Sequence, residues 1–196
     1  MSTNPLVGRC LVLLALVLIT LGASAPRPDR YELASESRFW IDGTATTGAW
    51  TCEADDLTGH GVVGGGREVE AEVTVPVRDF DCGLGPMTRD LRRALGADAH
   101  PTIEFALERA ETLDAEARPG SWVRVRATGT LRLAGTDQRI TVLAEGRRQP
   151  DGRVDLRGEQ PLRMSDFGVR PPSHALGLVR AHDAVVARFD LVAVAR

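Results

Sequence analysis

The 196-residue chain carries 24 basic and 27 acidic side chains, giving a formal net charge of -3 at pH 7. This length favours a single domain. The arginines are scattered among acidic residues and form no basic run, which argues against a nucleic-acid partner.

The first 25 residues are expected to be an export signal rather than part of the fold. An apolar run at 11–23, shorter than the roughly 20 residues that span a bilayer, follows a segment whose only charged side chain is Arg9. Small residues at 23–25 then fit a signal-peptidase site. We expect a mature domain at 26–196 that is periplasmic or secreted and has no stable membrane span; an uncleaved N-terminal anchor is the alternative.

Two cysteines remain after cleavage, Cys52 and Cys82. In an exported chain an even pair indicates one disulfide. A metal site would need further ligands, and no CxxC or HxxxH spacing accompanies the pair. We therefore expect a Cys52–Cys82 disulfide that joins the first long hairpin to the segment before the helix, and no metal.

Alternation of apolar and polar residues predicts strands along most of the mature chain. The stretch 68–77 (EVEAEVTVPV) has an apolar residue at every second position, the period of a half-buried strand. Turn residues at 135–137 separate the alternating stretch 121–135 from the one at 139–145, and turn residues at 150–152 precede the stretch 153–162. A close succession of eight to ten strands favours an antiparallel, all-β domain. The other expected strands are 31–33, 38–41, 49–54, 57–63, 102–107, 121–135, 139–145, 153–162 and 184–196.

One segment has the period of a helix instead. Met87, Leu91 and Leu95 are spaced i, i+4 and i+8, and Gly96 is placed as a C-terminal stop. This predicts a short amphipathic helix that covers the barrel.

Residues 59–64 (GHGVVG) have the G-x-G-x-x-G pattern of dinucleotide-binding turns. That pattern binds a pyrophosphate only where a strand precedes it and a helix opens inside it. Here the most regular strand of the chain follows, so no helix N-terminus is available for a phosphate. We expect these glycines to end one strand and form the hairpin into the next, and we expect no cofactor.

Candidate catalytic groups are sparse. Ser165 and Asp166, with His174 or His182, supply the residue types of a hydrolytic triad, but no G-x-S-x-G turn surrounds Ser165. We interpret them as polar residues near a barrel rim and predict that the protein is not an enzyme.

Small residues are frequent at positions expected to face the interior. An eight-stranded barrel is just wide enough to be filled by side chains or to hold one small ligand. Small residues leave apolar volume that suits a hydrophobic ligand, unless large neighbours fill it, an alternative that the sequence leaves open. The small inward positions are Ala71, Ala127, Gly129, Ala144, Gly158, Ala187 and Ala193.

Several stretches, in their order and spacing, resemble the YceI-like family of bacterial secreted proteins. The stretch 87–107 (MTRDLRRALGADAHPTIEFAL) is similar to that family's short helix followed by a Pro-Thr-Ile-x-Phe strand. The stretch 131–142 (LRLAGTDQRITV) resembles its strand–turn–strand unit, and 165–169 (SDFGV) its Ser/Thr-Asp-Phe-Gly element. The resemblance covers about 31–196.

The resemblance implies an extended, antiparallel, lipocalin-like β-barrel of about eight strands with one short helix. It implies an interior that takes a polyisoprenoid, an isoprenoid quinone or a similar long amphiphile, and no catalytic role. We expect a monomer or homodimer. The alternatives are a stress-related secreted barrel without a ligand, or a hydrolase or isomerase on the same scaffold.

The residues expected to form the apolar lining for this ligand come from most of the predicted strands. They are Phe39, Ile41, Trp50, Val73, Val75, Phe105, Val125, Ala127, Leu131, Phe167, Phe189 and Leu191. The rim residues His60, Asp166 and His174 are the candidates for contact with the polar head group.

Overall fold

The structure is a computed structural model that describes residues 29–64, 69–114, 118, 120–174 and 179–196. The predicted export signal at 1–25 lies outside these residues. Within the described ranges, no helix is long and apolar enough to cross a membrane.

Strands make up most of the described chain, as the alternation predicts. Two of them, β6 and β11, have two residues each, too few for a periodic pattern to indicate. In chain order the strands are β1 (Asp29–Leu33), β2 (Arg38–Ala45), β3 (Gly48–Ala54), β4 (Thr58–Val63), β5 (Val69–Pro76), β6 (Phe80–Asp81), β7 (Thr102–Thr112), β8 (Val123–Leu133), β9 (Thr136–Arg148), β10 (Val154–Arg163), β11 (Ser173–His174) and β12 (Val179–Ala195). The helices are η1 (Val77–Asp79), α1 (Gly85–Ala94) and η2 (Met164–Phe167).

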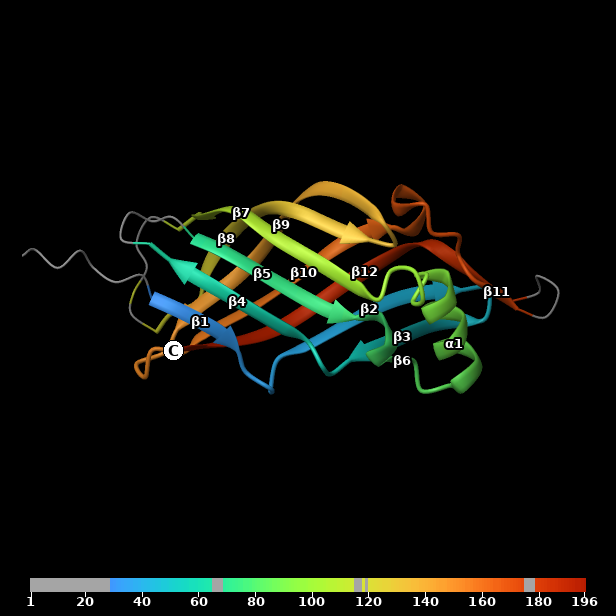
Figure 1. The fold of residues 1–196 in the computed structure, drawn as a ribbon, viewed down its shortest axis with the longest axis horizontal. Helices are drawn as coiled ribbons and strands as arrows, with labels where there is room; N and C mark the ends of the chain where they lie inside the picture. Colours follow the sequence, from blue (N-terminus) through green and yellow to red (C-terminus); the bar gives the residue numbers. More distant parts are fainter. Residues whose placement is uncertain (1–28, 65–68, 115–117, 119, 175–178) are drawn as a thin grey trace, which may run out of the picture.

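Eight of these strands close into an antiparallel barrel, which confirms the predicted fold class. Their order is β1–β4–β5–β7–β8–β9–β10–β12, and β12 returns to β1 where Ala195 pairs with Tyr31. Because every strand then has two neighbours, this ring has no free edge. The barrel is elongated (Figure 1).

The long last strand also carries a side sheet. β12 has 17 residues, so one of its edges is long enough to pair with two strands. Near the C-terminus this edge pairs with β1, and nearer the start of β12 it pairs with β2, where Phe189 is opposite Phe39. β2 continues into the hairpin with β3, and β3 pairs with β6. This side sheet lies at the same end of the molecule as α1 (Figure 1).

Helix α1 confirms the predicted amphipathic helix. Its buried face includes Thr88 and Leu91, and Leu95 follows at 4% exposure. Gly96 adopts φ +70°, a left-handed conformation that favours glycine and ends the helix as predicted. The helix therefore packs its apolar face against one end of the barrel.

The prediction for the GHGVVG glycines is confirmed in part, because Gly64 directly follows the end of β4 at Val63 and β4 pairs antiparallel with β5, the next strand. Gly59 and Gly61 lie inside β4, which pairs with β1 on one side and β5 on the other. A Cβ at Gly59 would stand 2.8 Å from a Leu33 side-chain carbon and 2.7 Å from the Glu72 carbonyl oxygen. Glycine is therefore required at this position by the close approach of two neighbouring strands.

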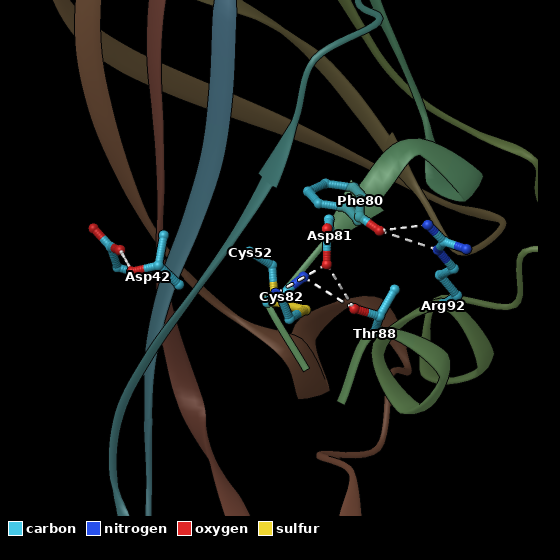
Figure 2. Close-up of a disulfide and its surroundings, with 9 residues drawn as sticks. Asp42, Cys52, Phe80, Asp81, Cys82, Thr88 and Arg92 are labelled. Carbon is cyan, nitrogen blue, oxygen red and sulfur yellow. Dashed lines mark hydrogen bonds between the residues drawn. A yellow bond between two sulfur atoms is a disulfide. The ribbon is translucent and has the colours of Figure 1, made fainter. Parts of the chain in front are cut away.

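The predicted disulfide between Cys52 and Cys82 is present (Figure 2). It joins β3 to the segment between β6 and α1, and both cysteines are buried, at 0% and 8% exposure. The backbone N–H of Cys82 donates to the Thr88 hydroxyl at 3.0 Å, and Arg92 donates two hydrogen bonds to the Phe80 carbonyl. These contacts fix the side sheet to the helix.

Candidate functional site

The barrel interior is tightly packed at the end that α1 covers. A buried apolar cluster there combines Phe80, Val77 and Leu91 with residues of the barrel strands and of η2. Five of the predicted lining residues belong to it, each no more than 8% exposed: Ile41, Val75, Leu131, Phe167 and Leu191. These five side chains have a structural role in the core, and their contact with a ligand stays a prediction.

Seven other predicted lining residues keep partial exposure. Five of them pack against the buried cluster: Phe39, Trp50, Val73, Phe105 and Phe189. Val125 and Ala127 lie outside the cluster and are half-buried. Along the inward face of β8, burial decreases from Leu133 and Leu131 to Val125 and Val123.

On other strands the inner face is mixed: Tyr31, Val142 and Leu191 are only 7–8% exposed, although they lie beside positions that stay partly accessible. Those inner-face side chains away from α1 that do stay partly accessible are almost all apolar. They include Ala71, Leu107, Ala110, Val123, Val125, Ala127, Ala144 and Leu156. A closed wall with accessible apolar side chains on its inner face can accommodate an apolar chain.

Aromatic rings lie over glycines of neighbouring strands. A Cβ at Gly129 would meet the Phe105 ring at 2.7 Å, and one at Gly158 would meet the Phe189 ring at 2.7 Å. At these two glycines the alternative that the sequence left open holds, because large neighbouring rings occupy the volume. The rings lie along the wall, where they replace the missing side chains.

The candidate triad residues are held in other interactions. The Ser165 hydroxyl donates to the Asp183 carboxylate at 2.7 Å, and the Ser165 backbone N–H donates to the same carboxylate. These hydrogen bonds lower the pKa of Asp183. The Nδ1 atom of His182 lies 2.8 Å from the Thr44 hydroxyl. The structure does not bring Ser165 and His182 together as nucleophile and base.

The proposed rim residues are separated in the fold. His60 is exposed on β4 and Asp166 is exposed on η2, while the side chain of His174 lies outside the described part. Across the residues that the structure describes, no group of three His, Cys, Asp or Glu side chains is arranged to hold a metal.

Comparison with known proteins identifies both the sequence family and the fold. A YceI-like domain is matched over residues 34–193, and no curated protein matches. A polyisoprenoid-binding domain from Saccharophagus degradans, implicated in plant cell wall breakdown, has 17% identity and a TM-score of 0.68, over 85% of this chain and 98% of that chain.

Two further solved structures share the fold. BcnA from Burkholderia cenocepacia has 17% identity and a TM-score of 0.64, over 80% of this chain and 95% of that chain. A YCEI protein from Campylobacter jejuni has 19% identity and a TM-score of 0.51, over 66% of this chain and 74% of that chain. Since the family match covers most of the chain and the closed barrel agrees with it, the protein belongs to the YceI-like family.

Proposed function

We propose that this protein binds a long-chain amphiphile of the isoprenoid type in the barrel interior and carries or sequesters it without catalysis. One observation carries the proposal: apolar side chains on the inner face, such as Val125, Ala127 and Leu156, stay partly accessible inside a closed wall. The distant structural likeness to a polyisoprenoid-binding domain supports the choice of ligand class.

The driving force is burial of the apolar tail. Transfer of apolar surface from water contributes about 25 cal/mol for each Å² removed. A long isoprenoid tail exposes much surface, and an apolar interior holds it without any specific polar contact. The head group then stays near solvent at an opening of the barrel.

A carrier role is favoured over catalysis by the positions of the ionisable groups. Ser165 and Asp183 satisfy each other, and His182 contacts Thr44. On the outer wall, arginines are paired with acids; Arg132, for example, bonds to Asp137 and Glu104. This pairing also offers little free positive charge to a nucleic acid.

The proposed location is the periplasm or the exterior of the cell, and the proposed state is a monomer or homodimer. The apolar run at 11–23 and the small residues at 23–25 support export. The buried disulfide supports it too, because disulfides persist in oxidising compartments.

The test is a titration of delipidated protein with farnesol, geranylgeraniol and straight-chain alcohols. Trp50, one of the residues proposed for the lining, lies against Gly43, whereas Trp40 and Trp122 stack with arginines. A variant with Trp40→Phe and Trp122→Phe therefore isolates the Trp50 fluorescence. We expect a saturable change that strengthens with isoprenoid length. No change with any amphiphile would favour a barrel without a ligand.

A further inference from the structure

The wall of the barrel opens between β9 and β10. These strands pair from Val154–Arg148 up to Glu159–Leu143. β10 then continues to Arg163 along β12, and β9 extends back to Thr136 along β8. In this fully described part of the wall, residues 139–142 and 160–163 have no backbone pairing with each other.

Pro161 provides a physical reason for the end of the ladder. It stands two residues beyond the last pair, Glu159–Leu143, and is itself in register with Val186 of β12. A proline has no N–H to donate, so it removes one hydrogen bond that a central strand would make with a neighbour.

Helix η2 borders the other end of this opening. The Thr136 hydroxyl donates to the Phe167 carbonyl at 3.2 Å, and the Gln138 side-chain amide donates to the Asp166 carbonyl. The opening is therefore a window in the wall, bounded by strand pairing at one end and by two side-chain hydrogen bonds at the other.

A cavity of about 690 Å³ lies at this window. Its lining includes inward apolar side chains, among them Ile140, Leu162 and Val185. It also includes exposed residues, Arg163 and Asp166. The cavity is therefore open to solvent on one side and borders the partly buried side chains of Ile140, Leu162 and Val185 on the other.

We propose that this window is the route by which the apolar tail of the amphiphile enters and leaves the barrel, an inference that rests on the proposed function. The end that α1 covers is packed and cannot admit a chain, because Phe80 and Leu91 fill it. At the window, Ile140 and Leu162 pack at the margin of the buried cluster but stay partly exposed, so they offer the tail an apolar path, while Gln160 and Arg163 keep the head group in water.

The test closes the window with a cross-link and measures ligand exchange. If the register of β9 and β10 is continued, Thr141 and Pro161 are opposite each other, and both are exposed. The variant Thr141→Cys/Pro161→Cys is joined with a short bis-maleimide, which leaves the buried native disulfide intact. The control is Glu145→Cys/Arg157→Cys, on the same strands where they already pair.

Stopped-flow fluorescence of Trp50 with geranylgeraniol then gives association and dissociation rates. With the window closed, we expect both rates to fall roughly tenfold or more. The Kd should be unchanged, because the route of entry alters neither the free nor the bound protein. The cross-linked control should exchange at the rate of the unmodified protein.

A single substitution tests the same proposal without a cross-link. Pro161→Val restores an N–H and should slow both rates, whereas Pro76→Val, a strand proline opposite Thr102 in the continuous wall, should not. If the cross-linked protein binds the ligand with unchanged rates, the window is not the route of entry, and the proposed function still holds. Absence of binding in the unmodified protein would overturn the proposed function itself.

Discussion

The contact between Gly158 and the Phe189 ring makes one residue-scale prediction. The two residues are paired across β10 and β12, and a Cβ at Gly158 would stand 2.7 Å from the ring. Gly158→Ala forces the ring to move, and such overpacking costs about 1–3 kcal/mol of unfolding free energy. Chemical denaturation of the single variants and of Gly158→Ala/Phe189→Leu measures this cost.

The double variant identifies the cause. Shortening the ring should remove most of the cost of the added methyl group, which gives a coupling between the two sites. Gly61→Ala is the matched control, since its Cβ would meet no atom nearer than 3.5 Å. Equal costs at Gly61 and Gly158, or no coupling, would contradict the contact.

Ala127 makes a second prediction at the same scale. It is half-buried on the inner face of β8, outside the buried cluster. Ala127→Phe should therefore leave the free energy of unfolding of delipidated protein nearly unchanged, because the ring enters accessible space. The same ring takes room from the tail, so isoprenoid affinity should fall strongly. A large loss of stability, measured by chemical denaturation, would instead indicate a filled barrel at this level.

At the scale of elements, the disulfide connects β3 to the segment between β6 and α1. The two cysteines are 30 residues apart, and closing such a loop stabilises a fold by about 3–4 kcal/mol in the chain-entropy account. Cys52→Ala/Cys82→Ala should lower the free energy of unfolding by about this amount. Denaturation of the variant beside the oxidised wild type measures it, and identical curves would contradict a stabilising role.

The strands were predictable from the sequence because alternation reports which side of a strand faces the core. It does not report which strands pair, so the double pairing of β12 with β1 and β2 was out of reach. For a related reason, the sequence could not show why Gly59 stands in the interior of a strand. Gly59 inside β4 is required by Leu33 and Glu72, residues of neighbouring strands that a single stretch does not reveal.

The candidate site was predictable only in part. Alternation correctly assigned residues such as Ala127 and Leu131 to one inner face, and both are there. It carries no information on position along the barrel axis, so it could not separate Leu131, buried in the packed end, from Val125, which stays accessible. The window escaped prediction because it arises where a ladder stops, and Pro161 was its one sequence signal.

At the scale of the whole molecule, surface carboxylates predict the response to acid. Hydrogen bonds from arginine or serine lower the pKa of four aspartates: Asp114, Asp137, Asp155 and Asp183. A lowered folded-state pKa contributes stability that is complete above the unfolded value of about 3.9 and is lost as pH falls through the folded pKa.

The urea concentration at the unfolding midpoint should therefore stay constant across neutral pH and decrease below about pH 4. Asp155→Asn should weaken this acid dependence, because Asp155 accepts bonds from Arg147 and Gln149. Asp151→Asn is the control, since Asp151 accepts a hydrogen bond from the backbone N–H of Arg153 but forms no ion pair with an arginine side chain among the described residues. Urea denaturation over a pH series measures both, and stability that rises on acidification would contradict the assignment.

The most direct test of an amphiphile-binding interior is native mass spectrometry of the mature protein purified from its own host, followed by organic extraction. We predict a bound mass that disappears on extraction and an extract that contains an isoprenoid lipid. The delipidated protein should then recover the same mass when that lipid is returned. A protein that carries no lipid when isolated, and takes up none when isoprenoids are added, would contradict the account.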